Sequence, residues 1–211
     1  MALASSPATG WRVATDRSLE AVVRDPTAPE FLRAPLTRWL TWQVRNQTTV
    51  LQALRAPQLA PAWAANLVVA AAQVEHDGTT RAFADALARA RPWQHLTVPL
   101  PLWPHAADWV ARAPTDPPIV YAAAAVRLDD QGRVQGLRLA LTGVSPRPVF
   151  VPQGLEAFLG RAAEPETWAA VAQAVAAQTR PRDDFRGSAE YRRAMAQVLT
   201  RRALQAAAAA A

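Results

Sequence analysis

The sequence predicts an α+β fold, and three observations lead to that prediction. Half of the 211 residues are apolar (51%), which is enough for a packed core. Residues 119–130 and 133–144 are two apolar runs on either side of a Gln-Gly turn, and this arrangement is a hairpin signal. Three helical patterns follow the hairpin in one block, so we expect a three-stranded antiparallel sheet with helices packed on one face.

Two helices are predicted near the start of the chain. Residues 16–24 carry apolar side chains at helical spacing. A second apolar stripe begins at about Leu36 and continues through Trp39 toward Val44. Pro35 suits the first turn of that second helix, because a first-turn residue needs no intrahelical N–H bond.

A strand pair is predicted next. Val68, Val69 and Val74 are β-prone residues, and Asp77-Gly78 is a strong turn signal between the two strands. The segments expected to follow are a helix over 82–91 and an extended segment over 95–103.

The Pro-rich segment 112–118 marks the predicted domain boundary, because it is a rigid connection between two different patterns. Beyond the hairpin, residues 147–152 ("RPVFVP") are expected to add the third strand. The helical patterns then lie at 154–160, 165–178 and 188–204. Ser188 is the expected N-cap of the last helix.

The last helix could be either a packed helix or a basic arm for nucleic acid. At 100° per residue, Tyr191, Met195 and Val198 share one face, which we expect to be buried. Arg192 and Arg193 point elsewhere and are expected to be solvated. Ordinary packing therefore explains the basic pattern, and a basic nucleic-acid-binding protein stays a remote alternative.

Composition narrows the class of protein. Cys does not occur, which excludes disulfides and thiolate metal sites on this chain and fits a cytoplasmic protein. No apolar run is long enough to predict a membrane-spanning helix, and residues 1–10, expected to form a loose leader, show no signal-peptide pattern. All basic residues are Arg, so we attribute the net charge of +6 to genome composition rather than to a nucleic-acid surface.

The candidate catalytic and metal-binding residues do not form a set. His76 lies beside a turn, and His95 and His105 flank Pro-rich extended chain; no pair has i, i+4 spacing, and no nearby acid completes a ligand set. Asp183 and Asp184 precede the last helix, where adjacent acids are usually solvated. The sequence also has no P-loop, dinucleotide Gly motif or Ser-centred elbow, so it predicts neither a metal site nor a self-contained catalytic site.

Two C-terminal motifs resemble a known family. The segment "DDFRGSAEYRRAMAQVLTRRAL" (183–204) resembles the C-terminal signature of the flavin-binding, medium subunit of molybdenum hydroxylases, the xanthine and carbon monoxide dehydrogenase family. The hairpin, with its Gly143-Val144 and Pro146-Arg147-Pro148 elements, resembles the hairpin that precedes this signature.

The resemblance implies two parts and an N-terminally truncated subunit. Residues 117–204 would form the C-terminal domain of such a subunit. Residues 11–111, where the similarity keeps its order but is thinner, would be a degenerate remnant of the flavin-binding domain's second subdomain.

The same resemblance implies FAD as the cofactor, held by two Gly-rich loops. The first loop belongs to an N-terminal subdomain for which the sequence shows no counterpart. The second aligns with residues 48–54, where Leu51 and Gln52 replace two glycines and Ala53 replaces Asn. Because a side chain obstructs the approach of backbone N–H groups to a pyrophosphate, we expect FAD to bind weakly or not at all.

Arg45, Asn46 and Thr49 remain as candidate cofactor-binding residues. By resemblance, such a subunit receives electrons from an iron–sulfur subunit and passes them through FAD to an acceptor. Substrate chemistry then occurs at a molybdenum cofactor on another chain, and neither nucleic acid nor a membrane is an expected partner. The alternative is a flavin-free scaffold or assembly subunit of the same kind of complex.

Overall fold

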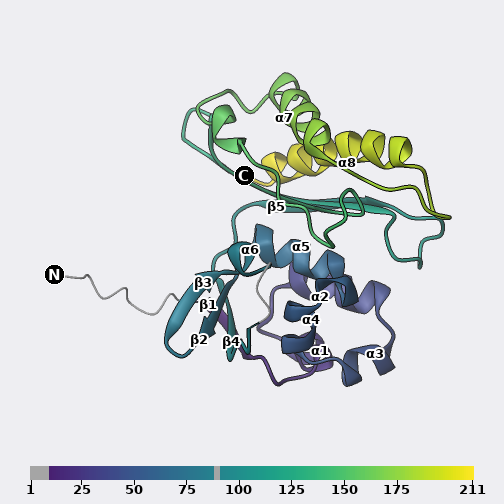
Figure 1. Ribbon diagram of the computed structural model, residues 1–211. Coiled ribbons are helices and arrows are strands. Elements are labelled where there is room, and N and C mark those ends of the chain that lie inside the picture. Colours follow the sequence, from purple (N-terminus) through teal and green to yellow (C-terminus); the bar gives the residue numbers. More distant parts are fainter. Residues whose placement is uncertain (1–9, 88–90) are drawn as a thin grey trace.

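The computed structural model describes residues 10–87 and 91–211, and it confirms the α+β class (Figure 1). The described residues contain two antiparallel sheets, one of four strands and one of three. The predicted loose leader, except for Gly10, lies outside the described residues. None of the described helices combines the length and the apolar character needed to cross a membrane.

The first sheet and a group of short helices form the N-terminal layer. In chain order its elements are β1 (Gly10–Ala14), α1 (Leu19–Arg24), α2 (Glu30–Trp39), α3 (Trp42–Gln47), α4 (Val50–Arg55), the 3-10 turn η1 (Pro57–Leu59), α5 (Pro61–Val69), β2 (Gln73–His76), β3 (Thr79–Ala82), α6 (Phe83–Ala86) and β4 (His95–Pro99). The strand order is β1-β4-β2-β3.

The second sheet and two long helices form the C-terminal layer. Its elements are β5 (His105–Val110), β6 (Val120–Leu128), β7 (Val134–Thr142), the 3-10 turn η2 (Leu155–Phe158), α7 (Pro165–Gln178) and α8 (Ala189–Ala209). Helices α7 and α8 cover one face of this sheet, as predicted, and α5 of the N-terminal layer packs against the other face (Figure 1).

Strand β6 joins the two hydrophobic cores. Tyr121 and Ala123 face the core of the N-terminal layer, whereas Val120 and Ala122 face α7 and α8. Because both faces are buried, residues Val120 to Val126 of the strand form an uninterrupted apolar run instead of an alternating one. The four consecutive alanines keep the strand thin, so helices can approach it closely from both sides.

The third strand of the second sheet is not the one predicted. Strand β5 pairs with β6 from Val110↔Val120 onward, whereas Phe150 makes only an isolated bridge to Leu141. Prolines on both sides of residues 149–151 lack the N–H groups that a ladder needs, which explains the correction. The proposed division into 11–111 and 117–204 stays a prediction, and the pairing of β5 favours a boundary before His105.

Helix α2 begins at Glu30 rather than at Leu36, so the prediction that Pro35 occupies a first turn is wrong. A proline inside a helix leaves the carbonyl four residues earlier without its usual donor. Here that carbonyl belongs to Phe31, and it accepts a 2.6 Å hydrogen bond from the Asn66 side chain of α5. A long-range contact therefore compensates for the helix-breaking residue.

The prediction of a strand pair is correct around the Asp77-Gly78 turn but wrong for Val68 and Val69. Val68 and Val69 lie in α5, where burial of every residue from Ala62 to Val69 overrides their β propensity. Strands β2 and β3 do flank the predicted turn, with positive φ angles at Asp77 (+48°) and Gly78 (+72°). The helix predicted over 82–91 is the short α6, and residues 88–90 of that prediction lie outside the described residues.

Candidate functional site

Residues 50–54, most of the segment predicted by resemblance to correspond to the second Gly-rich loop, are helical. Thr41 caps α3 and Thr49 caps α4, each with its side-chain oxygen accepting from a backbone N–H three residues later. In α4 the cap is reciprocal, because the Gln52 side chain accepts from the Thr49 N–H at 2.7 Å. Gln52, which the resemblance places where the family has a glycine, therefore acts as the second half of a capping box.

The backbone N–H groups at this helix start already have acceptors within the chain. The Val50 N–H donates to the Arg17 carbonyl at 2.8 Å, and the Leu51 N–H donates to the Thr15 carbonyl at 2.7 Å. The Gln52 N–H donates to the Thr49 hydroxyl at 3.2 Å. A phosphate group at this position would have to displace these internal acceptors, since such groups bind through free N–H donors.

Arg45 is engaged in an ion pair below α3. Its Nε lies 2.7 Å from Glu20 of α1, and its guanidinium also donates to the Leu40 carbonyl at 2.6 Å. Glu20 is buried and pairs in addition with Arg24 at 3.0 Å. The hydrogen bond from Arg45 is the main reason that the pKa of Glu20 is lowered, and it outweighs the opposing effect of burial.

The other two candidates also serve the local backbone. Asn46 is exposed, and its amide donates to the Trp42 carbonyl in the same helix at 2.8 Å. Thr49 is used in the capping box. A cleft of about 350 Å³ lies nearby, but its lining does not include any of the three candidates: it consists of Gln47, Thr48, Gln52, Arg55, Ala56 and Leu59. Arg45, Asn46 and Thr49 are close in sequence, but in the structure their side chains do not line one common cavity.

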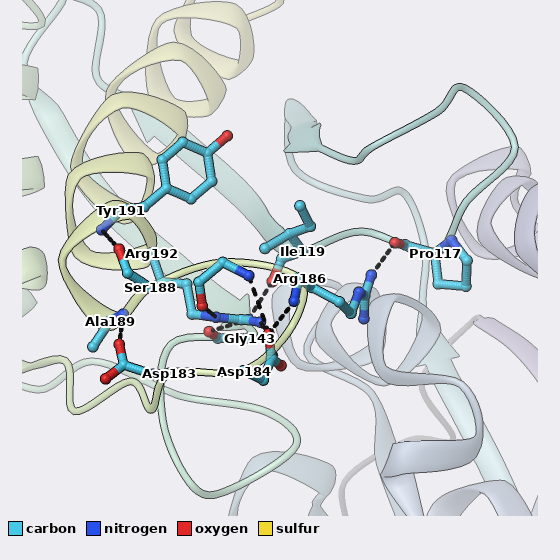
Figure 2. A network of polar contacts seen from close by, with 11 residues as sticks. Pro117, Ile119, Gly143, Asp183, Asp184, Arg186, Ser188, Ala189, Tyr191 and Arg192 are labelled. Carbon is cyan, nitrogen blue, oxygen red and sulfur yellow. Dashed lines mark hydrogen bonds and ion pairs between the residues drawn. The ribbon is translucent and has the colours of Figure 1, made fainter.

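The C-terminal signature builds a polar network that the sequence analysis missed (Figure 2). Arg192 was expected to be solvated, yet its side chain is 6% exposed. Its guanidinium contacts both carboxylate oxygens of Asp184 at 2.6 Å and donates to the carbonyls of Ile119 (3.0 Å) and Gly143 (3.1 Å). Arg192 therefore ties the start of α8 to the ends of β6 and β7.

The buried face of α8 is turned by about one residue from the predicted face. Ala196, Leu199 and Ala203 are buried, whereas Tyr191 is 39% exposed and Met195 is only partly buried. The prediction failed because Arg192 was assigned to solvent on the basis of its charge. Long-range acceptors instead make its burial possible, and Arg193 is exposed as expected.

Asp184 organises the turn that precedes α8. Its Oδ1 accepts from the backbone N–H groups of Arg186 (2.8 Å) and Gly187 (3.1 Å). Burial raises the pKa of Asp184, but the hydrogen bonds from Arg192 and the backbone together with the charge of Arg192 outweigh it, so the net pKa is lowered. The neighbouring Asp183 accepts from the Ala189 N–H at 2.6 Å, so the two acids serve this turn and helix start.

The histidines do not form a metal site. His76 Nε2 lies 3.2 Å from Asp77, and His105 Nδ1 lies 2.7 Å from the Trp103 carbonyl. His95 lies in β4, opposite Glu75 of β2. Across residues 10–87 and 91–211, no group of three His, Asp or Glu side chains could hold a metal ion.

An aromatic cluster lies between α2, α5 and the face of the second sheet opposite α7 and α8. Trp39 contacts Tyr121 and Trp109 edge-on, with ring centroids 5.7 and 5.4 Å apart. The buried Tyr121 hydroxyl donates to Asn66 at 2.7 Å, and burial raises the Tyr121 pKa. The side-chain amide of the same Asn66 donates to the Phe31 carbonyl of α2. Asn66 and Tyr121 therefore connect the N-terminal layer to β6.

The C-terminal part of the chain is similar to a known family of protein domains. Residues 106–207 match the family described as the CO dehydrogenase flavoprotein C-terminal domain. The medium chain of carbon monoxide dehydrogenase from Hydrogenophaga pseudoflava is 40% identical over 74 residues, which are 35% of this chain and 26% of that relative. Residues 106–207 thus match this flavoprotein domain family, and the resemblance to molybdenum hydroxylase medium subunits is confirmed.

Three solved structures share the fold over nearly the whole chain. Quinoline 2-oxidoreductase from Pseudomonas putida 86 aligns with a TM-score of 0.77 and 23% identity, over 97% of this chain and 77% of the matched chain. Carbon monoxide dehydrogenase from Hydrogenophaga pseudoflava aligns with a TM-score of 0.78 and 24% identity, over 97% of this chain and 77% of the matched chain. CO dehydrogenase from Oligotropha carboxidovorans aligns with a TM-score of 0.77 and 22% identity, over 98% of this chain and 78% of the matched chain. The layered arrangement of both sheets is therefore the fold of these oxidoreductase chains.

Proposed function

We propose that this chain is the medium subunit of a CO dehydrogenase-type molybdenum hydroxylase complex. The observation that carries the proposal is the family match over residues 106–207. The partners would be an iron–sulfur subunit and a molybdenum-cofactor subunit, and substrate chemistry would occur on the latter. The expectation of a cytoplasmic complex stays a prediction.

We further propose that FAD binding by this chain is impaired or lost. The support is local: the N–H groups of Val50, Leu51 and Gln52 are already used, and the Gln52 side chain closes the capping box. A hydrogen bond to a charged group contributes about 1.5–3 kcal/mol. Losing several of them removes a large part of the roughly 8 kcal/mol that micromolar affinity requires.

Calorimetric titration of FAD into the purified chain tests the flavin part of the proposal. We expect no saturable binding at micromolar FAD. The double variant Leu51→Gly with Gln52→Gly opens the capping box and restores the family's glycines, so it should bind FAD at least about tenfold more tightly, a change of about 1.4 kcal/mol. Gln58→Gly, in the neighbouring exposed turn, is the matched control and should leave FAD binding unchanged. A sub-micromolar dissociation constant for the unaltered chain would refute the flavin part.

The runner-up function is a flavin-free scaffold or assembly subunit, and the occupied N–H groups favour it. Co-expression with the iron–sulfur and molybdenum subunits separates the two functions. A complex that contains iron and molybdenum but no flavin supports the scaffold, whereas stoichiometric flavin supports the electron-transfer subunit. Steep salt-dependent retention on DNA, without association with those subunits, would instead support the remote nucleic-acid alternative.

A further inference from the structure

Phe185 stands out among the apolar side chains of the described residues. It is 88% exposed, which is the highest value for a large apolar side chain there. The other four phenylalanines are buried or partly buried. Single exposed apolar residues are common on protein surfaces. Exposure alone is therefore no argument, and the surroundings of Phe185 have to supply one.

The backbone on both sides of Phe185 is fixed. Asp184 and Gly187 bond each other through their backbone groups at 3.1 and 3.2 Å, which closes the turn around Phe185. Arg192 clamps the Asp184 carboxylate, and the Arg186 guanidinium donates to the Pro117 carbonyl (Figure 2). The aromatic ring is therefore held on a rigid turn. Binding of a partner to the ring would cost little backbone conformational entropy in this turn.

Cationic side chains lie in this turn and in the first turns of α8. Arg182, Arg186 and Arg193 are not in ion pairs with other described residues. The acids beside them are engaged, because Asp184 pairs with Arg192 and Asp183 caps the start of α8. An exposed aromatic side chain with arginines close by in the sequence fits the enrichment of aromatic residues and Arg at protein–protein interfaces.

We propose that residues 182–187 form a docking turn whose Phe185 enters an apolar pocket with an acidic rim on a partner polypeptide. This inference rests on the proposed function, since the partner is another subunit of the same complex. Nucleic acid fits less well, because Asp183 and Asp184 place two carboxylates within two residues of Phe185. A second copy of this chain also fits less well, because it would present the same arginines.

Phe185→Ala is the primary test variant. Binding of the full-length chain to the purified iron–sulfur subunit and to the purified molybdenum subunit is measured by surface plasmon resonance. We expect Phe185→Ala to weaken binding to one of them about 30-fold or more, as for a central interface anchor. The matched control is Leu159→Ala, which truncates a 46% exposed apolar residue elsewhere and should change binding less than about twofold.

A charge reversal tests the acidic rim independently. Arg182→Glu should weaken the same interaction and reduce its dependence on salt, because it replaces attraction by repulsion at the rim. Arg201→Glu makes the same charge change on the exposed side of α8, about 20 Å from the helix start, and should have little effect. The melting temperature of each variant confirms that the fold is intact.

The outcomes separate the two proposals. If the unaltered chain binds neither subunit, the proposed function fails and the docking turn fails with it. If the unaltered chain binds and Phe185→Ala binds equally well, the docking turn is refuted while the proposed function stands. A Phe185-dependent dimer of this chain, or Phe185-dependent retention on DNA, would also overturn the assignment to an acidic polypeptide.

Discussion

Replacing Arg192 by alanine tests the central structural interpretation of the C-terminal domain. In the folded chain this guanidinium makes five hydrogen bonds, to the carbonyls of Ile119, Gly143 and Gly187 and to both carboxylate oxygens of Asp184. Arg192→Ala removes all of them together and leaves a cavity beside the ends of β6 and β7. It thus disconnects the turn before α8 from the sheet.

The magnitude follows from the exposure of each partner. Breaking a buried ion pair by removing one member costs about 3–5 kcal/mol. The Asp184 side chain is 44% exposed, so water can solvate it after the change, and the low end of that range applies. We therefore expect the free energy of unfolding to fall by about 3 kcal/mol. For a chain of this size, that loss lowers the melting temperature by about 6–12 °C.

Thermal and urea unfolding followed by circular dichroism measure this loss, and pH dependence gives it a second signature. The pKa of Asp184 is lowered in the folded state, so its contribution is present above its ordinary value near 4 and is lost as pH falls through the folded pKa. The gap between the unaltered chain and Arg192→Ala should therefore narrow on acidification. The lowered pKa of Glu20 affects both proteins equally and cancels in this comparison.

The matched control is Arg193→Ala, one residue later on the exposed side of α8, which should change stability by less than about 0.5 kcal/mol. Arg192→Lys keeps the charge but loses the planar fork, so it should recover only part of the stability. If Arg192→Ala and Arg193→Ala unfold at the same temperature, the network does not stabilise the domain and the reasoning is refuted.

Two further predictions concern the ends of the central strands. Gly143→Ala should lower the free energy of unfolding by about 3 kcal/mol or more, because φ is +77° and the new Cβ would lie 1.9 Å from the Ile119 carbonyl oxygen. Gly132→Ala, at φ +69° in open space, should lower it by only about 1 kcal/mol in urea unfolding. Equal losses for the two variants would contradict the clash at Gly143. Tyr121→Phe should lower stability by about 1–3 kcal/mol, because it leaves the Asn66 oxygen without a donor in a buried site. An unchanged urea midpoint for Tyr121→Phe would show that water replaces the hydroxyl.

Local signals were enough to predict much of the C-terminal half. Strands β6 and β7, helix α7 and the Ser188 cap follow from apolar periodicity and capping residues, which are properties of neighbouring residues. The third strand was missed because β5 lies before the Pro-rich connection. Its pairing with β6 depends on a contact that periodicity does not encode.

The errors in the N-terminal half have the same origin. The sequence shows that Pro35 lacks an N–H, but it does not show that Asn66 supplies the missing donor to Phe31 from another helix. It likewise shows three adjacent replacements in residues 51–53. It does not show that Gln52 completes a capping box and that the N–H groups of Val50 and Leu51 bond to residues 15–17.

The C-terminal signature identifies the domain without identifying the chemistry. Its Asp184, Gly187 and Arg192 hold the turn before α8 against the ends of β6 and β7, so the role that the structure gives them is architectural. The segment that would have to hold the pyrophosphate is a separate one, residues 48–54, and its side chains satisfy its own backbone. A chain can therefore keep the family's C-terminal domain while its cofactor site changes, because the two sets of contacts share no residues.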